Sequence, residues 1–199
     1  MRISWNYTVD DWKRLRFASE TDWERAVKMF EDRLETRYLE HIRAILLSPT
    51  SGFAVLALDS ALIETLEQFR RGKPTTPKKQ GQQYFESFLT ETAFGEHFDV
   101  HRAGLFYKTI RCGLLHQSEA EGTSRIKRGG KLPLVAYTVD HSGIVINAPR
   151  FHKLLEMVVR EYAAKLRDPH SGTEREAFWR KMNYICRIEA KEAEIDGVA

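Results

Sequence analysis

An arginine and a histidine stand at a spacing that could handle a phosphate and a proton. Arg111 is followed by four residues and then by His116, in the stretch 106–119. Imidazole can act as a general base or acid near neutral pH. A guanidinium can hold a phosphate in a two-pronged fork and stabilise charge that develops on it. Because RNA supplies its own 2′-hydroxyl nucleophile, such a pair could cleave RNA without a metal and leave a cyclic phosphate.

One chain offers one histidine in this stretch, whereas the reaction needs a base and an acid. A symmetric dimer would bring two Arg111/His116 pairs into one cleft, so this hypothesis requires a homodimer. The alternative is structural. In that interpretation His116 caps carbonyls of its own helix, and Arg111 pairs with Glu64 or Glu119.

The neighbours of the pair set its geometry. On an ideal α-helical wheel Arg111 and His116 lie about 140° apart, with Lys108 between them. The length of arginine, and unwinding of the helix before Gln117, would let the two side chains converge. A helix C-terminus also favours an imidazolium, because backbone carbonyl dipoles point toward it.

Two further residues could support this site. Cys112 stands beside Lys108 and His116 on the wheel, where it could be a nucleophile or a packing residue. Glu64 and Asp59 interrupt the apolar helix expected over 52–71, and unpaired buried carboxylates are costly. Glu64 could therefore support Arg111 or His116, form a purely structural ion pair, or reach the rim of the core.

Basic segments offer further phosphate contacts. Arg125, Lys127 and Arg128 precede Gly129 and Gly130 in a loop after the motif, which could touch phosphate or lie solvated. The basic, proline-rich connector 72–81 allows the same two interpretations.

Two histidines stand at a spacing that suits a metal. His97 and His101 have the i, i+4 spacing of helical metal ligands, but no third ligand accompanies them. We therefore predict two surface histidines, no metal and no cofactor.

Apolar residues recur at helical spacing over most of the chain. We expect helices over about 21–47, 52–71, 84–94, 100–115 and 147–166, and a last one that begins near Thr173. Thr21 is the expected N-cap of the first helix, and Thr173 with Glu176 reads as a capping box. The glycines Gly104 and Gly113 predict close approach of a neighbouring helix. The predicted fold is mainly α, an antiparallel bundle of about five to six helices.

The spacing of apolar residues changes from the helical period to the two-residue period of a strand near 132–147. This predicts a small β-hairpin there, with a turn at 140–143. A lone hairpin is marginal, so it needs another strand or a helical surface, and the N-terminal arm or a second subunit could provide the strand. We expect an arm over 1–20 whose aromatic residues dock on the bundle, with a base-stacking platform as its alternative. A single domain over 21–190 and a flexible tail over 191–199 complete the expected organisation.

Composition narrows the protein class. With 199 residues, 42% of them hydrophobic and 30% charged, the chain can bury a real core. The net charge of +3 neither demands nor excludes nucleic acid. Two cysteines without metal-like spacing, no secretory signal and no apolar run of roughly 20 residues predict a cytoplasmic protein outside the membrane.

The segment Arg111-Cys112-Gly113-Leu114-Leu115-His116, late in a helical chain, resembles the Arg-x4–6-His signature of the HEPN superfamily (higher eukaryotes and prokaryotes nucleotide-binding domains). The long first helix and the apolar second helix with its internal carboxylate agree with that resemblance. It departs from the family at Cys112, a weak hydrogen-bond donor, where members commonly carry Asn, Asp or His.

The HEPN resemblance implies a dimeric helical bundle, joined through the face that carries the motif. It implies a metal-independent ribonuclease in a defence, toxin–antitoxin or RNA-processing setting, or an inactive module that binds RNA or a protein partner. Binding of a nucleotidyl group or another small phosphate is a third hypothesis.

Overall fold

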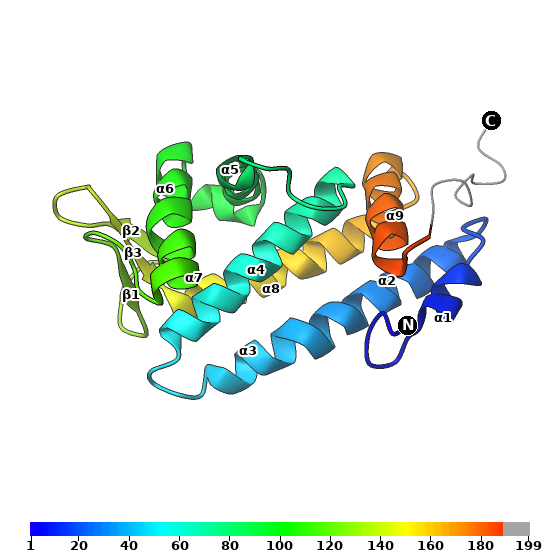
Figure 1. The fold of residues 1–199 in the computed structure, drawn as a ribbon, viewed down its shortest axis with the longest axis horizontal. Coiled ribbons are helices and arrows are strands. Elements are labelled where there is room, and N and C mark those ends of the chain that lie inside the picture. Colours follow the sequence, from blue (N-terminus) through cyan, green and yellow to red (C-terminus); the bar gives the residue numbers. More distant parts are fainter. Residues whose placement is uncertain (189–199) are drawn as a thin grey trace. The chain divides into compact units, whose positions relative to one another are not determined.

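Helices make up most of the protein, as the sequence predicts, and a small three-stranded sheet is its other regular element (Figure 1). The computed structural model describes residues 1–188, so the tail predicted over 191–199 lies outside the described residues. None of the helices in this described part combines the length and the apolar character that crossing a membrane requires.

The chain forms two compact units. Unit 1 comprises Met1–His41, Gln68–Thr75 and the chain from Arg160 onward, and unit 2 comprises Ile42–Glu67 and Thr76–Val159. The helices α4 (Gly52–Arg71) and α8 (Ala148–Arg167) contribute turns to both units. The single domain expected over 21–190 stays a prediction, and each unit is described by itself.

Unit 1 is built around aromatic rings. It contains α1 (Val9–Lys13), α2 (Glu20–Leu34), the π-helical segment η1 (Glu35–Leu39) and α9 (Gly172–Cys186). The ring of Phe30 lies 5.0 Å from that of Phe69 and 5.6 Å from that of Phe178, in edge-on contacts that favour aromatic pairs. Such an aromatic centre supplies the apolar burial on which the unit depends.

The N-terminal arm is partly helical and docks through one tryptophan. Thr8 and Asp11 form a capping box at the start of α1. Trp12 is buried, and its Nε1 donates to Asn183 Oδ1 at 2.8 Å. Trp5, in contrast, is 73% exposed, so the expectation that the aromatic residues of the arm dock holds only in part.

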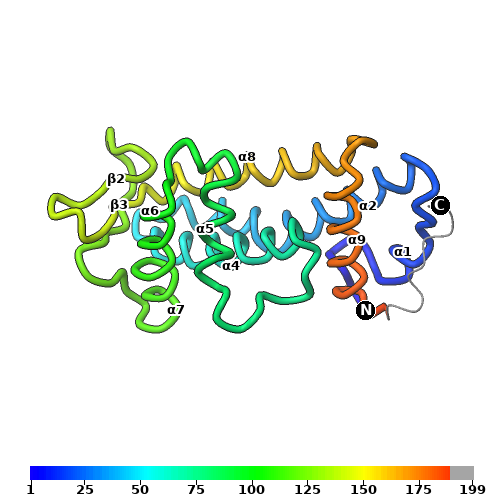
Figure 2. Tube along the Cα trace, turned by 90° about the horizontal axis from the view of Figure 1, so that it is seen from above, coloured from blue at the N-terminus to red at the C-terminus, as the bar shows by residue number. Residues whose placement is uncertain are grey.

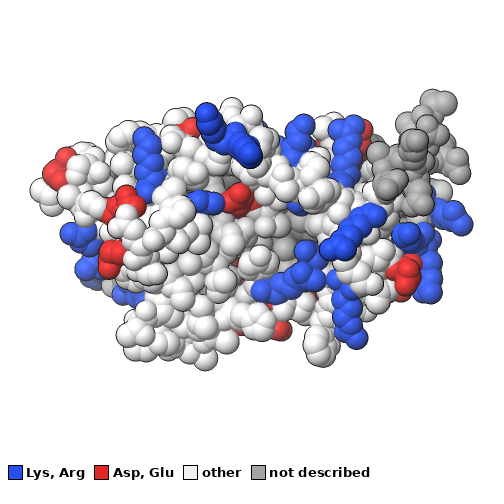
Figure 3. All heavy atoms as spheres, in the orientation of Figure 1, with Lys and Arg blue, Asp and Glu red and all other residues white. Residues whose placement is uncertain are grey.

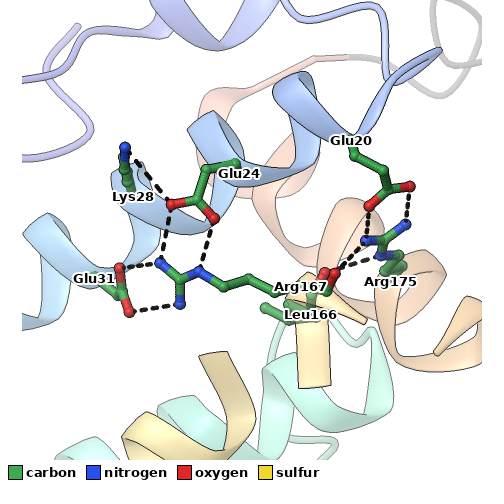
Figure 4. Close-up of polar contacts among 7 residues, drawn as sticks. All are labelled: Glu20, Glu24, Lys28, Glu31, Leu166, Arg167 and Arg175. Carbon is green, nitrogen blue, oxygen red and sulfur yellow. Dashed lines mark hydrogen bonds and ion pairs between the residues drawn. The ribbon is translucent and has the colours of Figure 1, made fainter. Parts of the chain in front are cut away.

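Two arginines join the helices of unit 1 (Figure 4). Arg167 donates to Glu24 at 2.7 Å and to Glu31 at 2.8 Å. Arg175 donates to Glu20 at 2.9 Å and to the carbonyl of Leu166 at 2.8 Å. Each guanidinium therefore binds carboxylates of α2, as partly buried charges require.

Both predicted N-caps in unit 1 are wrong. Ser19, not Thr21, caps α2, because its side chain accepts the backbone N–H of Asp22. The helix α9 begins at Gly172, with Ser171 at the cap position and no side-chain capping bond. Glu176 is held by Arg180 one turn later in the same helix, so it does not complete a capping box with Thr173.

Unit 2 has its own aromatic interior. It contains α3 (Glu40–Ile45) from Ile42 onward, α5 (Gly81–Glu91), α6 (Val100–Leu105), the π-helical segment η3 (Phe106–Cys112) and α7 (Gly113–Gln117). Phe106 stacks on Phe151 of α8 with ring centroids 5.0 Å apart. Phe94 lies 4.7 Å from the same ring. The helices α5 and α6 lie side by side over this interior (Figures 1 and 2).

The predicted hairpin is present and is extended by a third strand. The strands β2 (Val135–Tyr137) and β3 (Ile144–Asn147) pair antiparallel, with Val135 opposite Ile146. The strand β1 (Arg125–Lys127) pairs parallel with β3, which gives the order β1-β3-β2. The extra strand thus comes from the basic loop after the motif, and not from the N-terminal arm, whose bridge joins Arg2 to Thr8.

The buried Ser124 ties β1 to the rest of unit 2. Its hydroxyl lies 2.6 Å from that of Thr109 and accepts the backbone N–H of Ile144 at 3.1 Å. Through these two contacts the chain leaving the motif helix is held against it.

The motif helix, expected as one α-helix over 100–115, is α6, η3 and α7 in succession. It ends at Ser118, which has a left-handed φ of 56°. Beyond it the chain turns back, so that Glu121 donates its N–H to Thr109 O at 2.8 Å.

The two glycines of this helix meet different neighbours. Gly104 faces Glu86 of α5, as the predicted approach of a helix requires. For Gly113 that prediction is wrong, because its open side is occupied by the backbone carbonyl of Glu119, in the returning loop.

A side chain at position 113 should therefore destabilise unit 2. In Gly113→Ala the added methyl group meets the fixed carbonyl of Glu119, and we expect a loss of about 1–3 kcal/mol in the free energy of unfolding. Gly104→Ala is the matched control, because its methyl group would meet only the ends of flexible side chains, Glu86 Oε1 at 3.2 Å and Gln82 Nε2 at 3.5 Å. Urea unfolding followed by circular dichroism measures both, and equal losses would contradict this account.

Candidate functional site

Arg111 is held by an ion pair inside unit 2. Its Nη2 donates to Glu64 Oε2 of α4 at 2.9 Å. The side chains of Arg111 and Glu64 are 19% and 25% exposed, so the pair is partly withdrawn from water. Burial disfavours the charged guanidinium, but the hydrogen bond and charge of Glu64 outweigh it and raise the pKa of Arg111. The sequence suggested Glu64 or Glu119 as the partner of Arg111, and in the structure the partner is Glu64.

Aromatic rings and a thiol complete the surroundings of Arg111. Its guanidinium carbon lies 5.9 Å from the ring centre of Phe85 and 5.5 Å from that of Tyr107, within cation–π range. The thiol of Cys112, the next residue along the chain, is half-buried beside them. Burial raises the pKa of Tyr107, and Cys112 and Glu64 raise it further. This cradle fixes the direction of the guanidinium.

His116 and Lys108 differ from Arg111 because both are exposed. Among residues 1–188 no side chain or backbone group forms a hydrogen bond with the His116 ring, so the alternative in which it caps carbonyls of its own helix is absent. The ring stands in the last turn of α7, at the end where the helix dipole favours a positive charge. His116 is therefore free to meet a ligand or a second chain.

The π-helical segment changes the relation between Arg111 and His116. An ideal α-helical wheel separates them by about 140°. Phe106–Cys112 is instead wound with i→i+5 hydrogen bonds, so more residues fill each turn and the angle per residue is smaller. The segment ends at Cys112, however, and the residues from Gly113 to His116 belong to the α-helix α7, so the separation on the wheel is reduced only slightly.

Two of the three basic residues predicted to contact phosphate in the loop after the motif form hydrogen bonds within the protein. Arg128 donates to Ser51 Oγ at 3.0 Å and also to the carbonyl of Leu46. Arg125 donates to the carbonyl of Ser124 at 2.7 Å. Lys127 is exposed. Arg128 thus secures the connection before α4, and its guanidinium is not free for phosphate.

One face of the protein shows how its charged side chains are distributed. On the face that Figure 3 shows, Lys and Arg lie singly or in small groups with Asp and Glu among them. That distribution gives no extended electrostatic track for a nucleic acid on this face, so any recognition of phosphate depends on local groups.

The interior of unit 2 contains a hydrogen-bonded pair of ionisable side chains, of which the sequence analysis had singled out only one. Asp59 of α4 was expected to need a partner, and this partner is His152 of α8, with Oδ1 and Nδ1 2.8 Å apart. Their side chains are 0% and 2% exposed. His152 Nε2 lies 3.8 Å from Glu156, which accepts a hydrogen bond from Arg43 at 2.6 Å.

Burial governs the charge of this pair. It raises the pKa of Asp59 to about 6, although the hydrogen bond and charge of His152 act in the opposite direction. Neither group can touch a substrate, because both are enclosed. We interpret them as a polar anchor between α4 and α8 within unit 2.

Metal ligands do not assemble in the described part of the chain. His101 is occupied by Tyr137, whose hydroxyl lies 3.1 Å from its Nδ1. Within residues 1–188 no three His, Cys, Asp or Glu side chains are grouped so that they could hold a metal ion.

The chain was compared with protein-family models, with curated proteins and with solved structures, and nothing in the three comparisons matches it.

The Asp59–His152 pair makes a pH-dependent prediction. Because the folded-state pKa of Asp59 lies above the ordinary value of an aspartate, 3.8, its stabilising contribution is present below about pH 4 and is lost as the pH rises through about 6. Asp59→Asn cannot ionise and keeps an oxygen for His152. We therefore expect its free energy of unfolding, relative to the native chain, to increase by up to about 3 kcal/mol between pH 4 and pH 7.

Urea unfolding of both proteins at the two pH values measures this change. Glu96→Gln, which alters an exposed carboxylate of unit 2, is the control and should show no such gain. A difference between Asp59→Asn and the native chain that stays constant with pH would refute the assignment.

Proposed function

We propose that the protein is a HEPN-like, metal-independent endoribonuclease that acts as a homodimer through Arg111 and His116. In this proposal the helices form the HEPN type of antiparallel bundle, and the motif face of one copy meets that of another. A cytoplasmic role in defence, in a toxin–antitoxin pair or in RNA processing would follow.

The observation that carries the proposal is the contrast between the two motif residues. Arg111 is directed by Glu64 and by two aromatic rings, whereas His116 is exposed without a hydrogen-bond partner among the described residues. A catalytic site needs a fixed group that stabilises charge and a proton carrier that can reach the substrate. The motif supplies both residues from one short stretch of helical chain.

The reaction would proceed by transfer within the RNA. His116 of one copy removes the proton from a 2′-hydroxyl, and that oxygen attacks the adjacent phosphorus. The bond from phosphorus to the 5′-oxygen breaks, and His116 of the second copy donates a proton to the departing oxygen. Arg111 stabilises the negative charge that gathers on the phosphate oxygens. The products are a 2′,3′-cyclic phosphate and a 5′-hydroxyl.

A second function is favoured by the neutralisation of Arg111. Glu64 already compensates its charge, and Cys112 offers only a weak hydrogen bond beside it. The same face would then be an inactive HEPN-like module that binds RNA or a protein partner, and His116 would contribute contacts without moving protons.

Cleavage in the presence of EDTA separates the two functions. Mixed RNAs are incubated with the native chain, with His116→Ala and with Arg111→Lys, and the ends are identified. We expect cyclic-phosphate ends from the native chain, and rates about 10²–10⁴-fold lower in His116→Ala because general acid–base catalysis has that size. Arg111→Lys keeps a charge but loses the fork, so it should also be impaired.

Lys153→Gln removes an exposed charge from α8 in unit 2 and serves as the matched control. It should cleave like the native chain. If the native chain binds RNA but leaves it intact at high protein concentration, the binding module is the better description. If His116→Ala still cleaves RNA at the native rate, His116 is not the proton carrier.

The dimer is a separate prediction. Light scattering of the native chain should give twice the mass of one chain, since a lone copy cannot supply both a base and an acid at one phosphate. Mixing active chains with an excess of His116→Ala should lower cleavage more than dilution does, because mixed dimers hold one imidazole. A protein that is strictly monomeric and still cleaves RNA would contradict the composite site.

A further inference from the structure

Unit 1 contains a pocket that is separate from the motif. It lies at the C-terminal end of α9, opens to solvent and has a volume of about 550 Å³. Its walls are formed by Arg33, Tyr184, Ile185, Arg187 and Ile188. Pockets that bind small organic molecules have volumes of this order, roughly 300–1,000 Å³.

Arg33 and Arg187 line this pocket, and Lys181 lies beside it, with its ammonium 5.4 Å from the centre of the Tyr184 ring. Among residues 1–188 no Asp or Glu forms an ion pair with Arg33, Lys181 or Arg187. Arg33 donates to the carbonyl of Ile3 at 2.6 Å, and the buried Lys181 donates to Gln68 Oε1 at 2.7 Å. Both cations therefore rest on neutral acceptors.

Two other arginines of the same unit, one buried and one half-buried, do have carboxylate partners. Arg167 and Arg175 are each bound by carboxylates of α2, as Figure 4 shows. The contrast is informative because withdrawn charges are ordinarily paired. The pocket leaves positive charge available to a ligand.

The cations at the pocket also oppose one another. Burial lowers the pKa of Arg33 to about 10, and the charge of Arg37 lowers it further. Burial likewise lowers the pKa of Lys181 to about 8, with Arg33 adding to the effect. An anion in the pocket would relieve this repulsion.

The remaining walls suit an organic body attached to the anion. Ile185 and Ile188 are apolar, and the Tyr184 ring is half exposed with the Lys181 ammonium 5.4 Å from its centre. A ring provides a stacking face for a flat heterocycle. Guanidinium groups match the oxygens of a phosphate.

We propose that the pocket formed by Arg33, Tyr184, Ile185, Arg187 and Ile188 binds a small organic phosphate of the mononucleotide class. The phosphate contacts the two arginines, and the heterocycle lies on Tyr184. This site does not depend on the Arg111/His116 function, since its residues belong to unit 1 and those of the motif to unit 2.

The chain itself carries a competing source of negative charge. Glu189, Glu192, Glu194 and Asp196 follow the pocket residue Ile188 in the sequence. A full-length variant in which the three glutamates are changed to Gln and the aspartate to Asn removes these four negative charges. Nucleotide binding by this variant and by the native chain shows whether the carboxylates compete with a free ligand. Binding that is stronger in this variant identifies the carboxylates as competitors for the same site and supports the proposal.

Isothermal titration with adenosine 5′-monophosphate, inorganic phosphate and adenosine tests the site. We expect the nucleotide to bind more tightly than either part, because the phosphate and the ring have separate contacts. Arg187→Gln should weaken nucleotide binding about tenfold, the effect of losing one charge-assisted hydrogen bond. Arg187 is exposed, so this variant should fold.

Arg180→Gln is the matched control, because Arg180 is an exposed arginine of α9 that pairs with Glu176 outside the pocket. It should bind the nucleotide like the native chain, and so should His116→Ala. The proposal is overturned if neither the native chain nor the tail variant binds the nucleotide, or if Arg187→Gln and Arg180→Gln bind it equally.

Discussion

Charge that is withdrawn from water has to find a partner, and this constraint shapes the polar contacts inside both units. In unit 2 it joins Arg111 to Glu64 and Asp59 to His152, so two positions of α4 bind two other elements. In unit 1 it joins Arg175 to Glu20. Each pair couples neighbouring elements, because displacing one partner leaves the other charge, which is withdrawn from water, without compensation.

The helices follow from the sequence because their apolar periodicity is strong. The predicted helix over 52–71 coincides with α4, since a nearly continuous apolar surface leaves few alternatives. The ends were harder to predict, because Ser19 and Thr21 are both good caps and only tertiary contacts choose between them. The π-segments carry no distinct pattern of their own, and the three residues of β1 are too few to show alternation.

The candidate site was predictable to the extent that burial imposes pairing. Glu64 in an apolar helix implied a cationic partner, and Arg111 is that partner. His152 was missed because a single histidine beside Phe151 and Leu155 resembles packing. The structural contacts of Arg128 were not predictable for a different reason. Its partners are a backbone carbonyl and a serine hydroxyl, and neither type of group is visible in a pattern of charges.

The ion pair of Arg111 does not by itself decide between catalysis and binding. A guanidinium has five N–H donors, and the bond to Glu64 uses Nη2. The remaining donors can still meet a phosphate, but the net attraction is reduced because the carboxylate stays in place. Most of the attraction at this face would then come from Lys108 and His116, which are exposed. One chain offers few such charges, whereas two copies facing each other would double them around a single phosphate, so the proposed cleavage would gain from a dimer in electrostatics as well as in proton transfer.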